Sequence, residues 1–235
     1  MLFNSFQFLI FFPVVTLVFY LLPHRYRWFH LLAASCVFYM AFVPVYILIL
    51  FSTIVIDYFA GILIEQAGSQ SKRRTLVIIT VTLNLLVLAV FKYYNFFLEQ
   101  TDIILSGFGY RAPNLPYLDI LLPIGLSFHT FQALSYIFEV SRGNVKAERH
   151  FGIYSLYVMF FPQLVAGPIE RPQNMLHQFH EEKQFDSNRI IIGIKIMLWG
   201  FVKKLVIADR LGIYVNEIYS QAYKTGSLNL WLAVM

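Results

Sequence analysis

Charged residues are scarce in this sequence. Asp, Glu, Lys and Arg account for 13% of its 235 residues, whereas hydrophobic residues account for 58%. Soluble domains usually contain about 25% charged and about 45–50% apolar residues. A soluble fold of this size could not bury so much apolar surface, so the composition predicts an integral membrane protein. The 24 Phe and 15 Tyr residues are typical of helix interfaces and headgroup belts.

Cysteine is almost absent, because Cys36 is the single one in the chain. An intrachain disulfide is therefore excluded, and the redox compartment cannot be read from the sequence. Cys36 lies within an apolar run and is expected to be a small buried side chain. The first seven residues lack Lys and Arg, and no small-residue cleavage site follows the first apolar run, so an uncleaved first membrane helix is predicted.

Common catalytic and metal-binding motifs are missing as well. The chain contains no phosphate-binding glycine loop, no GxSxG elbow and no HExxH helix. His177 and His180 stand three residues apart, but no Cys or further His accompanies them, so no metal site is predicted. The net charge of +5 comes from basic residues in short loops, not from a continuous stripe, which argues against nucleic acid as a partner.

Long apolar runs, in contrast, follow one another along the chain. A helix that crosses a hydrocarbon core of about 30 Å needs about 20 predominantly apolar residues. Pro44 divides the longest run, since proline removes a helical N–H and clashes with the preceding turn. The predicted fold class is all-α, a polytopic transmembrane helical bundle with broken or re-entrant segments. The predicted spans are residues 3–22, 28–42, 45–64, 75–91, 118–140, 151–169 and 190–208, with an incomplete span from residue 228.

The distribution of basic residues orients these spans. Lys and Arg gather in three loops, at residues 25–27, 72–74 and 142–149. Cytoplasmic loops carry an excess of Lys and Arg, so all three loops are expected on the cytoplasmic face, with the N-terminus outside. If residues 151–169 crossed completely, Arg171, Lys183 and Arg189 would lie outside. A re-entrant or partly inserted segment would remove this conflict, since non-helical backbone is tolerated at membrane depth under a cover of protein or beside a watery cavity.

Two segments are broken by proline and glycine and carry polar side chains. Residues 121–132 contain Pro123 and Gly125, and residues 160–172 contain two prolines and a glycine within seven residues. Polar groups in a bilayer are costly unless they pair or face a cavity. Two interpretations stay open: the wall of a substrate path, or ordinary bonding between helices with an exposed loop at the second segment. The candidate residues for a substrate path are Ser127, His129, Gln132, Gln163, Glu170 and Arg171.

Other polar residues lie in or near apolar runs. Three of them are isolated and are expected to pair within the bundle: Asp57, Asn84 and Glu139. Lys195, Trp199 and Lys203 recur at the helical spacing i, i+4, i+8. They are interpreted either as lining a cavity or as reaching to the headgroups, and the second reading is favoured for Lys203. His129 has no companion carboxylate or histidine at a telling spacing, so no catalytic residue is assigned.

Five motifs follow one another along the chain. They are the opening MLFNSFQFL, then FSTIVIDYFAG at 51–61, LPIGLSFHTFQ at 122–132, FFPQLVAGPI at 160–169 and GFVKKLVIADR at 200–210. In this order they resemble the membrane-bound O-acyltransferase family, specifically its alginate O-acetyltransferase branch. The resemblance covers essentially all 235 residues. It implies that residues 1–235 are the N-terminal half of a single acyltransferase domain in the cell inner (plasma) membrane, and that the chain stops within a helix.

The resemblance also implies an activity. Members of the family move an acyl group, usually acetyl, from a cytoplasmic donor to a hydroxyl of a polymer or lipid. The donor would be an acetyl thioester or an acyl carrier acting as a substrate, with no bound cofactor. The acceptor would be an exopolysaccharide such as alginate, and an extracytoplasmic acetylation partner protein is implied as well.

The family's general base is a histidine buried in the membrane core, a role that suits an imidazole. By resemblance this histidine belongs to the second half of such proteins, and none of the six histidines here corresponds to it by motif. It is therefore expected beyond Met235, and the 235 residues are expected to be inactive alone.

Two other functions stay open from the residues alone. The broken segments also resemble the discontinuous helices of a transporter or flippase, which would predict a related repeat of opposite topology downstream. A structural subunit is the third possibility. It would be favoured if substitutions at His129, Gln132, Gln163 and Glu170 left the activity of the intact complex unchanged.

Overall fold

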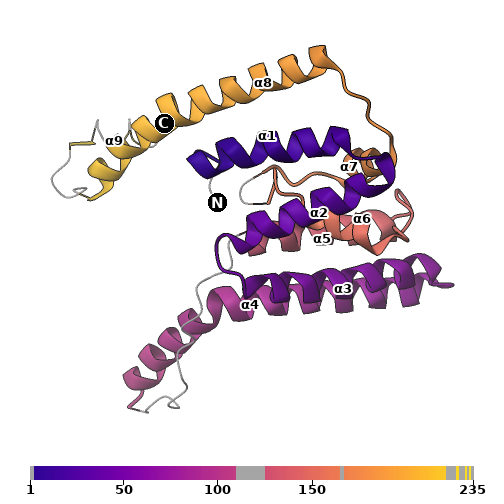
Figure 1. Ribbon diagram of the computed structural model, residues 1–235. Helices are drawn as coiled ribbons and strands as arrows, with labels where there is room; N and C mark the ends of the chain where they lie inside the picture. The colour runs from indigo at the N-terminus through magenta and orange to yellow at the C-terminus, as the bar shows by residue number, and fades with distance from the viewer. Residues whose placement is uncertain are drawn as a thin grey trace. The chain divides into compact units, whose positions relative to one another are not determined.

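The computed structural model describes residues 3–109, 125–164, 167–220, 226–227, 231 and 233. All regular elements in this part of the chain are helices, which confirms the predicted all-α class (Figure 1). The chain divides into two compact units, Met1–Lys183 and Gln184–Met235. The helices of the first unit are α1 (Phe6–Leu21), α2 (His24–Met40), α3 (Tyr46–Gln66), α4 (Gln70–Gly107), α5 (Leu126–Ser141), α6 (Phe151–Met159) and α7 (Pro172–His180).

The boundaries of the first three helices lie close to the predicted spans. α1 begins after Ser5, whose side chain accepts a hydrogen bond from the Phe8 N–H and so caps the first turn. Pro44 lies between the end of α2 and the start of α3, as its chemistry requires. α3 and α4 are the two helices in the described residues that are long and apolar enough to cross a membrane, and α1 is a shorter apolar helix.

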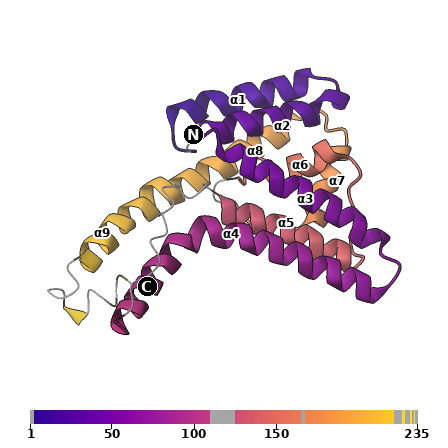
Figure 2. The same cartoon turned by 90° about the horizontal axis from the view of Figure 1, so that it is seen from below.

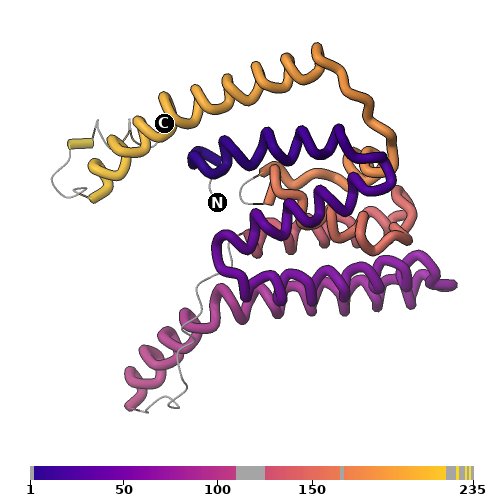
Figure 3. The backbone as a smooth tube through the Cα atoms, viewed as in Figure 1, coloured from indigo at the N-terminus to yellow at the C-terminus, as the bar shows by residue number. Residues whose placement is uncertain are grey.

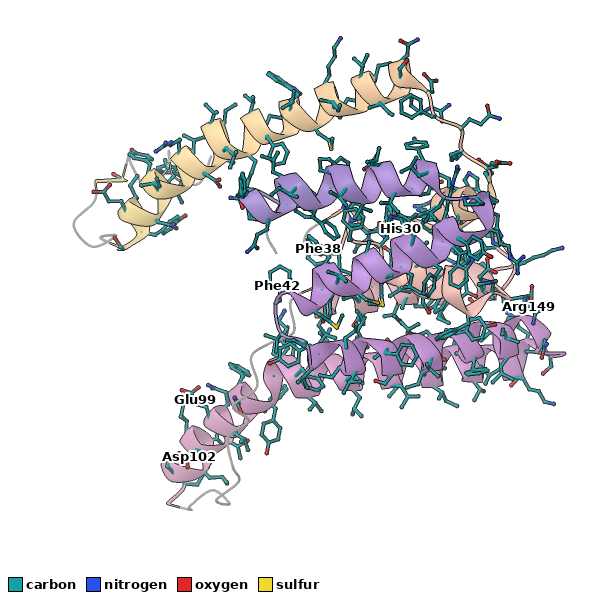
Figure 4. The ribbon with its side chains drawn as sticks, in the orientation of Figure 1. His30, Phe38, Phe42, Glu99, Asp102 and Arg149 are labelled. Atoms are coloured by element: carbon teal, nitrogen blue, oxygen red, sulfur yellow. The ribbon has the colours of Figure 1, made fainter. Side chains whose placement is uncertain are left out.

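α4 is much longer than the predicted span 75–91. Its 38 residues correspond to about 57 Å at 1.5 Å per residue, well beyond a hydrocarbon core. The helix continues because no proline or glycine interrupts the sequence before Gly107. In Figure 4 Glu99 and Asp102 lie on this extension, which leaves the side of α3 and projects away from the other helices of its unit.

α5 begins later than the predicted span 118–140. Gly125 is its N-cap and has a positive φ of 78°, a conformation that glycine adopts without steric cost. The preceding part of the first broken segment, including Pro123, lies outside the described residues. α5 packs against α3 and α4, and Figure 2 shows α4 and α5 side by side.

The three basic segments meet at one end of the first unit, but residues 25–27 and 72–74, predicted as loops, lie in the first turns of α2 and α4, and only 142–149 is a linker. The linker between α5 and α6 lies against the end of α3: Glu65 accepts from the Ala147 N–H at 3.1 Å and pairs with Arg149. At the start of α4, Arg73 donates to the Ser141 carbonyl at 3.4 Å. The start of α2 reaches the same linker, because the Trp28 and His150 rings are 4.6 Å apart. The common end of the basic loops, inferred from charge alone, is thus present in the structure, and Figure 4 labels Arg149 there.

The chain from α6 to α7 forms a hairpin that enters the unit and returns to the same end. α6 begins beside Trp28, near the start of α2, and after it the Phe161 N–H donates to Ser35 in the middle of α2 at 3.1 Å. After α7 the chain is back at the start of α2, where Arg27 donates to the Lys183 carbonyl at 2.5 Å. The tube in Figure 3 follows this path.

The hairpin differs from the single helical span predicted over residues 151–169. Its first helix has nine residues, about 14 Å at 1.5 Å per residue, which is too short to cross a bilayer. One continuous helix over 151–169 is therefore absent, because α6 ends at Met159, and the membrane topology of this segment stays a prediction. Pro162 explains the break, since a proline disfavours helical backbone in the residue before it.

Aromatic side chains fill the core of the first unit. The Phe161 ring at the hairpin tip lies 5.3 Å from Phe11 of α1 and 5.9 Å from Phe38 of α2. Tyr136 of α5 and Tyr154 of α6 are fully buried with their rings 4.7 Å apart. The hairpin is thus held by α1, α2 and α5 together.

The second unit consists of α8 (Ser187–Phe201), a π-helical segment η1 (Val202–Ala208) and α9 (Asp209–Ser220). The predicted span 190–208 corresponds to α8 and η1 together. Lys203 lies over the Trp199 ring at 5.5 Å, and Lys204 pairs with Asp209 at 2.5 Å. No described residue of α8 or η1 is buried, and both interpretations of Lys195, Trp199 and Lys203 stay predictions. The run from residue 228 lies almost entirely outside the described residues.

Candidate functional site

A small hollow lies where the hairpin tip meets the start of α5. Its volume is about 10 Å³, close to the room that a single water molecule needs. α5 contributes Phe128, His129 and Gln132, and the hairpin contributes the remaining lining residues: Val158, Gln163, Leu164, Gly167, Pro168 and Ile169. The two broken segments singled out by sequence therefore meet at one site.

Gly125 allows α5 to approach the hairpin this closely. A Cβ at this position would overlap the Leu164 carbonyl oxygen and would lie 3.1 Å from the His129 Nε2 atom. The positive φ of 78° is a second reason for glycine. One residue therefore sets both the start of the helix and its distance from the hairpin.

His129 is buried and bonded on one side of its ring only. Its Nδ1 atom lies 3.2 Å from the Val158 carbonyl, at the end of α6. A carbonyl only accepts hydrogen bonds, so Nδ1 carries the proton. In the neutral ring Nε2 then has a free lone pair and is an acceptor. This Nε2 atom has no hydrogen-bond partner among the described residues.

Gln132 supplies the second polar group without a partner. It lies one helical turn after His129, so both side chains are on the same face of α5. Its side chain is 4% exposed, and within the described part of the chain its Nε2 atom meets no acceptor. Buried polar groups without a partner are rare and costly, so a hollow with two of them points to a bound polar group.

The two groups are complementary to a hydroxyl. The His129 Nε2 lone pair can accept the hydroxyl proton, while the Gln132 amide N–H can donate to the hydroxyl oxygen. A water molecule fits the same pattern and the same volume. The arrangement can thus bind and orient one O–H group.

Gln163 closes the hollow from the hairpin side. Its Nε2 donates to the Tyr157 carbonyl at 3.1 Å, which folds the side chain back over α6. The Tyr157 hydroxyl donates to the Glu170 carbonyl at 3.0 Å and so ties both sides of the hairpin together. Gln163 is therefore held in place by the hairpin itself.

The six predicted path residues divide into two groups. His129, Gln132 and Gln163 line the hollow. Ser127 is half-buried on α5 but is not among the lining residues, and Glu170 enters the network only through its backbone carbonyl. Arg171 is exposed and is the N-cap of α7. The structure therefore brings together half of the predicted set, and the substrate path itself remains a prediction.

The sequence did not single out Tyr157, Leu164 or Gly167 for this site. A Cβ on Gly167 would overlap the Gln163 backbone, so this glycine lets the chain turn tightly behind Gln163. Its signal in the sequence is the Gly-Pro pair at 167–168, which indicates a turn. Tyr157 carries no such signal, since its role depends on the return of the hairpin.

The isolated polar residues pair within the bundle, as predicted. Asn84 of α4 donates to Asp57 of α3 at 2.6 Å. Glu139 of α5 accepts from Asn144 at 2.8 Å and also from Gln173 of α7. Glu139 therefore joins α5 to the returning arm of the hairpin.

The open end of the hairpin carries a polar network. His180 lies 2.8 Å from Glu148 and, at 3.2 Å, its carbonyl contacts the His24 ring. Lys183 donates to Glu181, and this hydrogen bond lowers the pKa of the Glu181 carboxyl. No group of three or more His, Cys, Asp or Glu suited to a metal ion occurs in the described residues.

Comparison with known proteins finds relatives along the whole chain. It is 34% identical to a probable alginate O-acetylase of Pseudomonas aeruginosa, over 100% of this chain and 45% of that protein. It is 36% identical to a probable alginate O-acetylase of Azotobacter vinelandii, over 100% of this chain and 47% of that protein. A peptidoglycan O-acetyltransferase of Helicobacter pylori is 28% identical over 86% of this chain and 42% of its own length.

These matches also define how much of the relatives the chain represents. The chain spans about half the length of the curated relatives it matches. No family model matches it, and no solved structure matches it significantly. The alginate O-acetylases align with the entire chain, so the resemblance seen in the five motifs is confirmed: this chain is similar over its whole length to alginate O-acetylases.

Proposed function

We propose that this chain is part of a membrane O-acyltransferase that transfers an acyl group, most simply acetyl, to hydroxyls of an exopolysaccharide such as alginate. The observation that carries this function is the identity of 34–36% to two alginate O-acetylases over the whole chain. The peptidoglycan O-acetyltransferase among the relatives supports the same reaction on a different polymer. The general base is not assigned to any of the six histidines of the chain.

The proposed setting is the inner membrane, crossed several times. Two helices have the length and apolarity of membrane spans, and α1 is a further apolar helix. The shared end of the three basic loops is assigned to the cytoplasm, because cytoplasmic loops carry the excess of Lys and Arg. The hairpin of α6 and α7 then enters from the cytoplasmic side and returns to it. This places Arg171 and Lys183 without the conflict that a complete crossing would create.

The hollow at the hairpin tip is proposed as part of the substrate path. The tip contacts Ser35, which lies 11 residues after the start of α2 and thus about 16 Å along that helix. That depth is roughly half of a 30 Å hydrocarbon core. Non-helical backbone at such a depth is tolerated where it lines a cavity, which fits the hollow beside it. The His129 and Gln132 groups would orient a hydroxyl or an ordered water along the path.

The proposed substrates and partners lie on the two faces of the membrane. An acetyl thioester or an acyl carrier would supply the acyl group at the cytoplasmic end. The polysaccharide acceptor and an extracytoplasmic acetylation partner would lie on the opposite face. No bound cofactor is required for this reaction class.

Deletion and complementation test the proposed function. In a host that makes an acetylated exopolysaccharide, deletion of the complete gene should remove the acetyl esters, measured by proton NMR of the purified polymer. Re-expression of the complete protein should restore them. Unchanged acetyl content after deletion, with polymer yield also unchanged, would refute the proposal.

A further inference from the structure

Asp57 is a buried carboxyl for which the substrate path has no use. It lies on α3 and is 0% exposed. It takes part in no ion pair among the described residues. An ionised carboxylate buried without a cation is strongly disfavoured, and such a group usually becomes neutral instead. Its surroundings therefore need a physical explanation.

Asn84 is the hydrogen-bond partner of Asp57, and the orientation of its amide is fixed. Its Nδ2 atom donates to Asp57 Oδ1 at 2.6 Å and to the Thr80 carbonyl at 3.0 Å. Both of these atoms accept hydrogen bonds, so a flipped amide would face two acceptors with its oxygen. Both amide protons are thereby used, and Asn84 Oδ1 is left as an acceptor.

Two acceptor atoms remain, one on each side chain. Asp57 Oδ2 and Asn84 Oδ1 are buried and have no partner in the part of the chain that the structure describes. A carboxylic acid and a primary amide can form two parallel hydrogen bonds, N–H to one carboxyl oxygen and O–H to the amide oxygen. The first of these bonds is present, and the two atoms left over are the ones that the second bond would join.

We propose that Asp57 is a proton-binding site, in which the neutral carboxylic acid donates through Oδ2–H to Asn84 Oδ1. One proton satisfies both remaining acceptors and removes the charge from the interior. It also makes the pair a two-bond link between α3 and α4. The Thr80 hydroxyl does not compete for this proton, because it donates to the Leu76 carbonyl at 2.9 Å in its own helix.

Tyr154 is the other titratable group facing Asp57. It lies on α6, is 0% exposed, and is close enough to Asp57 to interact with it electrostatically. Its hydroxyl oxygen has no hydrogen-bond partner among the described residues. The Tyr136 ring of α5 packs in a tilted arrangement against the Tyr154 ring, and the Tyr136 hydroxyl accepts a hydrogen bond from the Glu148 N–H at 2.9 Å. In the alternative arrangement, Tyr154 would donate to an ionised Asp57, so this residue distinguishes the two states.

Infrared spectroscopy of the full-length protein in lipid tests the proton directly. The wild type at neutral pH should show the carbonyl band of a protonated carboxylic acid, and Asp57→Asn should lose it. The matched control Glu65→Gln removes a partly exposed carboxylate paired with Arg149 and should leave the band unchanged. Absence of the band from the wild type would overturn the proposal.

Stability measurements test the pairing independently. The double variant that exchanges the pair, Asp57→Asn with Asn84→Asp, should keep the carbonyl band. Its thermal midpoint should stay within ~2 °C of that of the wild type, a smaller shift than a stability loss of ~1 kcal/mol would cause. Tyr154→Phe should likewise keep both, and it remains informative if Asp57→Asn fails to fold. Replacing sodium by choline in the buffer should not move the thermal midpoint, because a neutral Asp57 needs no cation. A large fall of the thermal midpoint in Tyr154→Phe would show that Asp57 is ionised and would contradict the proposal. A thermal midpoint that depends on sodium would do the same.

Discussion

Gly125 is the residue on which the geometry of the hollow depends most. It combines a positive φ of 78° with a backbone position where any side chain would meet the Leu164 carbonyl. The polar side chains of the hollow can act together only because α5 comes this close to the hairpin. The spacing of His129 and Gln132 along α5 would be the same without this approach, but the hollow would not form.

We predict that Gly125→Ala strongly destabilises the protein. The left-handed backbone alone costs about 1–2 kcal/mol for an alanine, and the overlap with the hairpin adds to it. Thermal unfolding should therefore show a midpoint several degrees lower than that of the wild type.

Gly143 provides the matched control for this substitution. It also has a φ of 78°, but no atom lies within 4 Å of the position that a Cβ would take. Gly143→Ala should show only the backbone cost of about 1–2 kcal/mol. Equal losses in the two variants would mean that contact with the hairpin is not important at Gly125.

Some of the site could be predicted from these residues and some could not. His129 and Gln132 were identified because polar side chains in an apolar run need a partner or a cavity. The Val158 carbonyl that fixes the His129 tautomer could not be identified, because a backbone acceptor leaves no mark in the sequence. Ser127, Glu170 and Arg171 satisfy the same polarity criterion, yet none of the three lines the hollow.

The hairpin of α6 and α7 is the element that sets the topology of the first unit. Its two arms are joined by the Tyr157 hydroxyl, which reaches the Glu170 carbonyl at 3.0 Å. Its ends contact the linker before α6 and the start of α2. Both ends of the hairpin therefore lie at the same end of the first unit.

Cysteine labelling in intact cells tests this topology. In a Cys36→Ser background, Glu182→Cys after the hairpin should react from the same side of the membrane as Gly68→Cys, in the basic loop between α3 and α4. Ala41→Cys, between α2 and α3, should react from the opposite side. If Glu182→Cys reacted from the same side of the membrane as Ala41→Cys, residues 151–169 would cross the membrane completely.

The helices differ in how well the sequence predicts them. α1, α2 and α3 could be placed from apolar length and from Pro44, since these signals are local. The continuation of α4 to Gly107 could not be predicted, because the part of this helix beyond the predicted span is not a continuous apolar run. The early end of α6 at Met159 follows from Pro162, but the return of the chain depends on contacts with α1 and α2.

At the scale of the whole molecule, the chain spans about half the length of the curated relatives it matches. Its relatives are about twice as long, and they align with it from end to end of this sequence. The hollow contains one histidine, bonded to a backbone carbonyl and without a carboxylate partner in the described residues. This arrangement suits the orientation of a hydroxyl.

Acetyl transfer by membranes containing the complete protein and its His129→Phe variant is the most direct test. The substitution keeps a ring of similar size but removes both polar atoms, and Phe131→Leu, at an exposed position on the same helix, is the control. With a labelled acetyl thioester and de-esterified polymer, we expect label in the polymer for the wild type and the control. His129→Phe should transfer roughly tenfold less, the equivalent of about 1.4 kcal/mol from one lost hydrogen bond. Wild-type transfer by His129→Phe at equal protein levels would contradict a substrate path through the hollow, and no transfer by any of the three would contradict the O-acyltransferase itself.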